Sequence, residues 1–464
     1  MNKGIKLLNN SIIFAIGNLG SKVISIILIP LFTYFLTTKE YGTIDLIMTT
    51  LNLLLPVVSL SIFDGVMRYS MDKEYQSEEV FSAGMIVTFC STFLIILLSL
   101  IFNILGYKYA ILFGMLLIMQ TYQSLFSQYS RAIGKVKIFA SNGIFLSLLT
   151  SIFSVIFLAA LRMGVEGYLY SLILSFILSN IYLAKKLNIK DIIILKINIP
   201  LTKMLLLFSI PLIPNALAWW LTNASSRYFI LGYVGASANG LFALSNKIPS
   251  LLSIFTSIFN QAWQLSAIEE YEEGNKDNFN SKVLDYYTQF LFISIAFLLP
   301  FTKIIFHYFI SIEFQQAALY IPIMLISVFY SSLSSFLGAS YIAAKKTKGV
   351  FYTTIVGGII SIIANFLLIP KYNIFGAGIS ITVSFMIISL IRYVDSKKNN
   401  NMKIDISKFV LSHIIIIIQS ALFYFDNNAI TVILQILVIL FFFVINKIIF
   451  IEILKKIVSK IRKV

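Results

Sequence analysis

The sequence predicts an all-α polytopic membrane protein with about 14 transmembrane helices, each close to the 20 residues that cross a bilayer core. Of the 464 residues, 58% are hydrophobic and only 12% are charged, and the mean hydropathy is +0.90. A soluble domain carries about 25% charged residues, because its surface must be hydrated. Apolar stretches recur along the whole chain, and the lysines and arginines lie mostly between them.

Fourteen segments have the length and hydropathy of a membrane span. The predicted spans are residues 11–35, 43–67, 80–105, 109–129, 138–161, 165–184, 204–233, 237–268, 283–306, 318–343, 350–370, 374–394, 409–425 and 429–451. No connection between them is long enough to hold a folded catalytic domain. We therefore expect the protein to act between its helices and not as an enzyme with catalytic residues.

The distribution of basic residues orients these spans. With both termini in the cytoplasm, 28 of the 36 lysines and arginines fall on cytoplasmic segments or the adjoining ends of spans, five fall on outward loops or the adjoining ends of spans, and three lie deeper inside spans. This asymmetry is what the positive-inside rule demands of a multi-pass membrane protein whose two termini lie in the cytoplasm. The net charge of +16 therefore follows mainly from the orientation of the spans, and its expected partner is anionic lipid rather than nucleic acid.

Spans one to six and seven to twelve resemble two copies of one plan. The segments "FLTTKEYGTIDLIMTTLNLLLP" and "FILGYVGASANGLFALSNKIPS" both contain a Gly-marked turn followed by a polar-spotted helix with a proline. The predicted parts are two pseudo-symmetric six-helix lobes, 1–184 and 204–394, a cytoplasmic connector, 185–203, and a tail with two further helices, 395–464. Because six is even, both lobes enter the membrane from the same side, which is an arrangement of transporters with a site between the halves.

Three cations lie within predicted spans and away from the span ends, namely Lys22, Arg227 and Lys247. Lys22 and Lys247 fall near mid-membrane, on early helices of the two lobes. An ammonium at the bilayer centre costs about 2.5–3.5 kcal/mol on insertion scales, so intramembrane cations normally face a hydrated cavity or a counter-charge. One interpretation is a cationic cavity that binds an anion, and the other is snorkelling or pairing with buried acids.

Asp64 and Arg68 lie near the cytoplasmic end of span two. Their i, i+4 spacing predicts an ion pair on one helix face. Arg68 is either an orientation charge or a cation at the rim that meets an anionic headgroup, and Asp64 is a candidate ion or proton site. Two histidines, too few and too far apart for a metal centre, give no reason to expect a metal or another cofactor.

Polar and aromatic residues follow the same helices. They are either interhelical hydrogen-bonding groups or the lining of a wet path that suits sugar hydroxyls. The candidates are Asn18, Asn52, Asn215, Trp219, Asn223, Asn246, Asn260, Gln261 and Gln264. Core packing is the alternative for the tryptophans. Prolines are predicted to interrupt these spans at Pro30, Pro56, Pro211, Pro214 and Pro249, and broken helices in corresponding positions point to a transport site.

Several stretches carry a family resemblance. "IPLFTYFLTTKEYGTIDLI" with "SLSIFDGVMRY", and "FSIPLIPNALAWWLTNASSRYFILGYVGASANGLFALSNKIPSLLSIFTSIFNQAWQ", resemble the openings of the two halves of Wzx-type polysaccharide biosynthesis flippases. Their sixth and twelfth helices are resembled by "GVEGYLYSLILSFIL" and "FGAGISITVSF". These belong to the multidrug/oligosaccharidyl-lipid/polysaccharide exporter superfamily. The resemblance covers residues 1 to about 394 in order, and the last two spans fit the fourteen-helix members of the superfamily.

The resemblance implies a flippase in the cytoplasmic (inner) membrane of a bacterium, which moves undecaprenyl-pyrophosphate-linked oligosaccharide repeat units across that membrane for O-antigen or capsule. It implies a cationic central cavity with roles for Lys22, Arg227 and Lys247, and a glycan polymerase is a candidate partner. One alternative is a cation-coupled drug exporter of the same superfamily, which needs acids in its cavity. The other is an integral-membrane glycan polymerase or acyltransferase, which should show large outward loops or a buried catalytic histidine.

Overall fold

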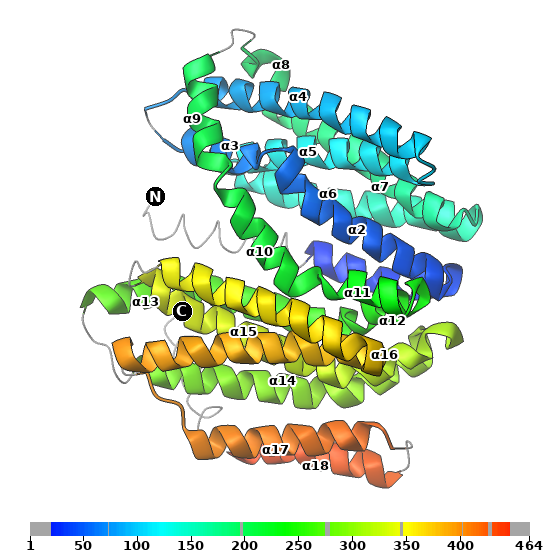
Figure 1. Cartoon of the computed structure of the whole chain (residues 1–464), viewed down its shortest axis with the longest axis vertical. Helices are drawn as coiled ribbons and strands as arrows, with labels where there is room; N and C mark the ends of the chain where they lie inside the picture. Colours follow the sequence, from blue (N-terminus) through cyan, green and yellow to red (C-terminus); the bar gives the residue numbers. More distant parts are fainter. Residues whose placement is uncertain are drawn as a thin grey trace, which may run out of the picture. The chain divides into compact units, whose positions relative to one another are not determined.

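The computed structural model describes residues 20–72, 74–194, 198–273, 279–343, 347–400, 402–425 and 429–445. Within these ranges every regular element is helical and no strand occurs (Figure 1). Among the described residues, ten helices are long and apolar enough to cross a membrane, or eleven if one bent pair counts as a single span. The longest, α16 (Thr347–Asn400), covers two predicted spans and is kinked at Asn373. The class of fold is thus confirmed, while the number of fourteen spans stays a prediction.

The chain divides into two compact units, and each is described by itself. The first contains the described residues up to Trp220, and the second begins at Leu221, inside α10. The helices of the first unit are an apolar helix Gly20–Phe35, α2 (Thr38–Val58), α3 (Ile62–Ser70), α4 (Ser77–Ile104), α5 (Ala110–Ala132), α6 (Val136–Ser154), the π-helical η1 (Val155–Ala160), α7 (Gly164–Leu187), α8 (Ile189–Ile192), α9 (Ile199–Ser209) and most of α10 (Leu212–Ala224).

The second unit contains the remaining helices. They are α11 (Ser226–Tyr233), α12 (Ala236–Ser245), α13 (Lys247–Glu273), α14 (Phe279–Phe309), the 3-10 helix η2 (Ile312–Tyr320), α15 (Ile321–Ala343), α16, α17 (Ile406–Phe423) and α18 (Ala429–Ile445). The domain limits and the repeat expected from the sequence stay predictions.

Local sequence signals explain where helices begin. Thr37 and Glu40 form a capping box at the start of α2, in which the Thr37 hydroxyl accepts from the Glu40 N–H and the Glu40 carboxylate accepts from the Thr37 N–H. Asp405 caps α17 in a similar way by accepting from the Lys408 N–H. These caps satisfy amides that have no partner inside the helix.

The proline predictions are confirmed in part. Pro56 lies in the last turn of α2 before a break, and Pro211 separates α9 from α10. Pro214 and Pro249 lie in the first turns of α10 and α13, where a missing N–H costs no helical hydrogen bond. The expected interruption at Pro30 is wrong, since the helix Gly20–Phe35 continues through it. Transmembrane helices tolerate such prolines when neighbouring groups satisfy the freed carbonyl.

The core of the first unit lies where α3, α4, α5, α7 and α9 meet. Phe81 of α4 and Tyr129 of α5 are buried there, with ring centroids 4.4 Å apart. Gly65 lets α3 approach α9 closely, because a side chain at this position would meet the Ser209 hydroxyl. In a bilayer this close van der Waals packing, rather than exclusion of water, holds helices together.

Two clusters fill the core of the second unit. Ile230 of α11 and Phe242 of α12 pack on the buried face of α16. Trp263 of α13 is stacked on Phe336 of α15 at a ring distance of 4.5 Å, and its Nε1 donates to the Phe336 carbonyl at 3.2 Å. The second cluster therefore joins α13 to α15 by both packing and a hydrogen bond.

The helix α17, which precedes α18, is bonded along the length of α14. Lys408 Nζ lies 3.2 Å from Asp285 Oδ2, Gln419 Nε2 donates to the Ala296 carbonyl at 2.8 Å, and Lys303 Nζ donates to the Phe425 carbonyl at 2.9 Å. Residue numbers rise together in these pairs, so α14 and α17 run parallel. The ninth and thirteenth predicted spans, 283–306 and 409–425, must run parallel as well, because all odd-numbered spans cross the membrane in the same direction. Figure 1 shows α17 and α18 side by side.

The ion pair at the start of this contact should contribute to stability. Replacing Lys408 by alanine leaves the half-buried Asp285 carboxylate without its cation, and we expect a loss of about 1 kcal/mol in the free energy of unfolding. Thermal melting of the purified protein in detergent measures it. The loss should be smaller in 1 M salt, because the Debye length there is about 3 Å and salt screens the attraction between the two charges. An equal loss at both salt concentrations would contradict an electrostatic origin.

Candidate functional site

Lys247 follows a break in a helix, as the sequence predicts. The helices α12 and α13 together have the length and hydropathy of one span, but they are bent by 43° at Asn246. The Asn246 side chain donates to the Phe242 carbonyl at 2.8 Å and so satisfies one carbonyl near the end of α12. Lys247 is the first residue of α13 and is exposed.

Arg227 of α11 packs near the same break. Its guanidinium carbon lies 5.4 Å from the centroid of the Phe242 ring, and its Nη1 lies 3.5 Å from the Asn223 carbonyl. Phe242 therefore contacts Arg227 through its ring and Asn246 through its carbonyl. The structure thus brings Arg227 and the residue before Lys247 to one residue of α12, Phe242.

Lys22 belongs to the first unit. It lies in the first turn of the helix Gly20–Phe35 and is exposed. An exposed ammonium on an apolar helix needs water or an anion beside it. Whether Lys22 meets Arg227 and Lys247 at one cavity stays a prediction.

The expected ion pair between Asp64 and Arg68 is wrong. Arg68 Nη1 instead lies 3.8 Å from Asp72 Oδ2, one turn further along the chain. Asp64 is half-buried in the first turn of α3, just after Leu60 and Ser61, which have positive φ angles of 52° and 49°. At this end of the helix the dipole itself favours a carboxylate, so Asp64 does not require a basic side chain.

The polar candidates divide by exposure. Asn52 and Asn215 are exposed in the first unit, and Asn223, Asn246, Asn260 and Gln264 are half-buried in the second. Asn18 and the side chain of Gln261 lie outside the described residues. The Asn260 Oδ1 is buried without a hydrogen-bond partner. The exposed amides suit a hydrated surface better than lipid, because an amide in hydrocarbon loses its hydrogen bonds to water.

The tryptophans differ from one another. Trp263 is 3% exposed and belongs to the core, as described above, whereas the candidate Trp219 is 64% exposed. Trp220 donates from Nε1 to the Thr49 carbonyl of α2 at 3.1 Å. Core packing therefore accounts for Trp263 but not for Trp219, whose side chain is mostly exposed.

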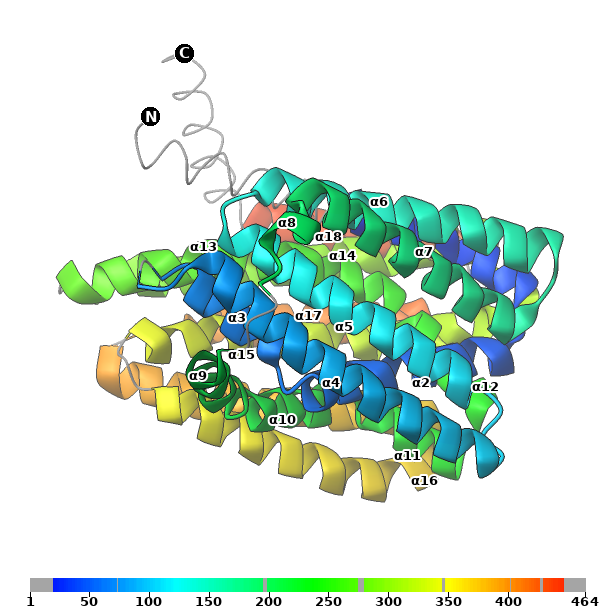
Figure 2. The same ribbon diagram turned by 90° about the horizontal axis from the view of Figure 1, so that it is seen from above.

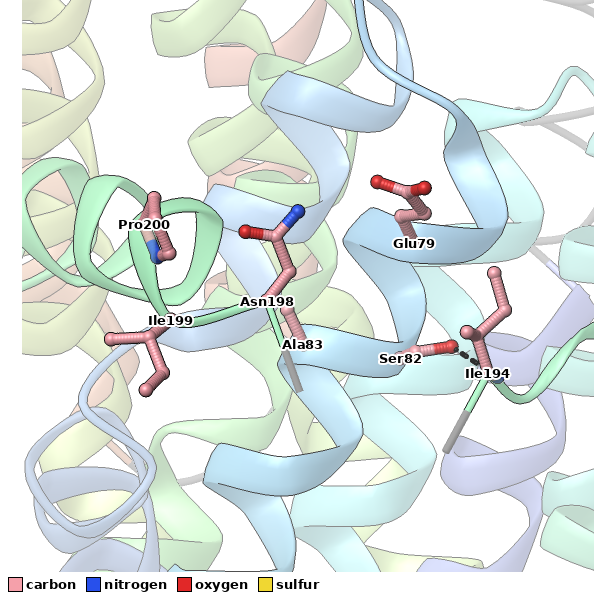
Figure 3. A pocket seen from close by; sticks show the side chains of 7 residues that line it. All are labelled: Glu79, Ser82, Ala83, Ile194, Asn198, Ile199 and Pro200. Carbon is pink, nitrogen blue, oxygen red and sulfur yellow. Dashed lines mark hydrogen bonds between the residues drawn. The ribbon is translucent and has the colours of Figure 1, made fainter. Parts of the chain in front are cut away.

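A cavity of about 400 Å³ lies in the first unit beside the start of α4 (Figure 3). Its lining comes from Glu79, Ser82 and Ala83 of α4 and from residues near the start of α9. Ser82 Oγ accepts a hydrogen bond from the Ile194 N–H at 2.9 Å. None of the predicted site residues lines this cavity. Within the described ranges, no group of three His, Cys, Asp or Glu residues could hold a metal ion.

Comparison with family models matches residues 7–264, more than half of the chain, to the family described as polysaccharide biosynthesis protein. The chain belongs to this polysaccharide biosynthesis protein family. No curated protein matches the sequence. The resemblance inferred from the sequence is therefore confirmed at the level of the family.

Solved structures share the fold of this polysaccharide biosynthesis protein at low identity. The lipid II flippase MurJ in an inward closed conformation is 14% identical over 95% of this chain and 100% of that chain, with a TM-score of 0.69. An inward-facing multidrug resistance MATE family transporter of the MOP superfamily is 13% identical over 86% and 98%, with a TM-score of 0.64. A MOP superfamily transporter from Pyrococcus furiosus, whose binding pocket has reverse polarity, is 14% identical over 85% and 95%, with a TM-score of 0.59.

Two features of this polysaccharide biosynthesis protein escaped the sequence predictions. Arg392 of α16 is 5% exposed and donates to the Ser334 carbonyl at 2.8 Å and to the Thr353 hydroxyl at 3.0 Å, so it joins α15 to α16. The other feature is a set of glutamines on α5. Both were visible as polar residues in apolar segments, but nothing in the sequence distinguished them from the polar residues that were chosen.

Proposed function

We propose that this polysaccharide biosynthesis protein is a flippase for undecaprenyl-pyrophosphate-linked oligosaccharide repeat units. It translocates them across the cytoplasmic membrane by alternating access, for export of O-antigen or capsular polysaccharide. The observation that carries the proposal is the positive charge of the candidate site. Lys22, Arg227 and Lys247 are all cations, and the chain is a member of the polysaccharide biosynthesis protein family.

The pyrophosphate is the group that these cations would bind. An ammonium or guanidinium near a phosphate oxygen makes a charge-assisted hydrogen bond, which is roughly twice as strong as a neutral one. Lysine presents a point charge on a flexible stem and therefore suits a ligand that must be released. The prenyl tail stays in lipid, and exposed amides such as Asn52 and Asn215 contact the sugars.

The membrane potential favours export of such an anion. Each negative charge that leaves a cell with a negative interior gains about 2.3 kcal/mol per 100 mV. Asp64 is a candidate site for a coupled ion or proton, because it is a half-buried acid in the first turn of α3, beside the break after α2. A glycan polymerase that accepts the repeat units on the outer side is the expected partner.

A drug exporter is the second candidate, and the likeness in fold to multidrug resistance MATE transporters favours it. Such an exporter would need acidic residues to attract cationic drugs. The three predicted site residues inside spans would repel a cationic drug instead, since like charges in a medium of low dielectric repel strongly. The flippase is therefore the better supported of the two.

Deletion of the gene should distinguish the flippase from the drug exporter. In cells without it, we expect undecaprenyl-linked repeat units to accumulate and surface glycan to fall to background, because the units cannot cross the membrane. Mass spectrometry of extracted lipids and surface-glycan staining measure this, with a plasmid copy of the gene as the control. Unchanged glycan together with increased sensitivity to cationic drugs would contradict the flippase and support the exporter.

A further inference from the structure

A strip of polar side chains runs along the inner half of α5, in a chain where most helices are apolar. We name it the amide strip, and it consists of Gln120, Gln123, Ser124, Ser127 and Gln128. Successive residues of an α-helix turn by about 100°, so these five positions lie on one side of α5. Gln123 Nε2 donates to Ser127 Oγ at 3.1 Å, which confirms that neighbouring members of the strip face the same way.

The opposite side of α5 packs on α4, which lies beside it in Figure 2. The Tyr122 hydroxyl lies 3.3 Å from Thr92 Oγ1, and the Tyr129 ring packs on Phe81. α4 also carries many exposed apolar side chains, as expected of a helix that meets lipid. These are Phe89, Phe93, Leu94, Ile96, Leu97, Leu98, Leu100 and Ile101. The amide strip therefore points away from the helix that meets lipid.

Two acceptors of the amide strip have no partner. Gln120 Oε1 and Gln128 Oε1 are buried and make no hydrogen bond, although both residues are only half-buried overall. A buried amide oxygen without a donor is costly, and within a membrane no bulk water can supply one. Such groups persist where a bound ligand supplies the donor in part of the working cycle.

The depth of the amide strip fits a path for a hydrophilic group. At 1.5 Å per residue, Gln120 lies about 15 Å from the start of α5 and Gln128 about 27 Å from it, near the predicted cytoplasmic end. Arg131, in the last turn of α5, is exposed. The strip thus extends from mid-membrane to the side from which the substrate would enter.

We infer that the amide strip binds the sugar residues of the lipid-linked substrate, an inference that rests on the proposed function. A glutamine amide both donates and accepts hydrogen bonds, as does a sugar hydroxyl, and it carries no charge that would compete for the pyrophosphate. Lys22, Arg227 and Lys247 bind the pyrophosphate, and the amide strip recognises the glycan. Its unpaired acceptors take their donors from sugar hydroxyls when the first unit opens to the substrate.

Binding of two lipids tests this division of roles. The probes are undecaprenyl pyrophosphate and undecaprenyl-pyrophosphate-linked N-acetylglucosamine, added to the full chain in detergent and followed by tryptophan fluorescence. We expect the wild type to bind the sugar-bearing lipid about tenfold more tightly, which is what one or two neutral hydrogen bonds supply. In the double variant Gln120→Leu, Gln128→Leu this ratio should fall severalfold, since two acceptors for the sugar are gone, while affinity for the sugar-free lipid is unchanged.

Tyr122→Phe is the matched control, because it removes a hydroxyl from the opposite side of the same helix, and it should keep the wild-type ratio. Unchanged binding of the sugar-free lipid also shows that the double variant is folded, and the two single variants replace it if it is not. A double variant that keeps the tenfold ratio, or a wild type that shows none, overturns the inference. A wild type that binds neither lipid overturns the proposed function instead.

Discussion

Replacing Lys22 and Lys247 by alanine should abolish surface glycan while leaving the amount of protein in the membrane unchanged. Each ammonium is proposed to make a charge-assisted hydrogen bond to the pyrophosphate, and loss of such a bond costs about 1.5–3 kcal/mol, or roughly a factor of 10 to 100 in binding. Both side chains are exposed, so their removal opens no cavity in the core. Surface-glycan staining of cells that carry only the variant, with immunoblotting of membranes for abundance, measures the effect.

Two controls make this result specific to charge at the site. The pair Lys22→Arg and Lys247→Arg keeps both charges and should restore most of the glycan. Lys39→Ala removes an exposed lysine from the first turn of α2, on a predicted outward loop, and should have no effect. Normal glycan in the double alanine variant would remove these lysines from the transport site, whereas an inactive wild type would count against the flippase itself.

Replacing Trp263 by alanine should have the largest effect on stability. The side chain is 3% exposed, and its loss removes the stacking on Phe336 together with the hydrogen bond to the Phe336 carbonyl. Truncation of a buried Trp costs about 3–5 kcal/mol, because the space is only partly refilled. Thermal melting of the purified protein in detergent measures the change.

The matched variants are Trp263→Phe and Trp219→Ala. Phenylalanine keeps a stacked ring but loses the donor, so it should lower the melting temperature less than alanine does. Trp219 is 64% exposed, so its truncation should leave the melting temperature near that of the wild type. If Trp263→Ala melted with the wild type, the cluster between α13 and α15 would not be part of the stabilising core.

Much of the fold could be predicted because apolar length alone decides which segments can cross a bilayer. The breaks near Pro56 and Pro211 were also predictable, because the missing proline N–H leaves a carbonyl unbonded. Pro30 shows the limit of this argument. In an apolar surrounding a helix gains nothing by exposing its backbone, so the chain stays helical there.

The site could be predicted less well, because the sequence does not say which partner a charge will choose. Arg68 has an acid four residues away on either side, Asp64 and Asp72, and both spacings suit an ion pair. In the structure α3 begins at Ile62, so Asp64 lies in its first turn, and Arg68 pairs with Asp72, two residues past the helix end. The sequence also could not predict that the acceptors of Gln120 and Gln128 are unpaired, since this depends on the side chains that surround them in the fold.

The parallel contact between α14 and α17 determines where a reporter group would be informative. Lys408 and Phe425 are bonded to α14 near its two ends, so a change in the tilt of α14 must turn α17 through a similar angle. Ile417 lies between these attachments with 60% of its side chain accessible. A spin label at this position would thus record the angular motion of the second unit during turnover, without any alteration to the residues that handle the substrate.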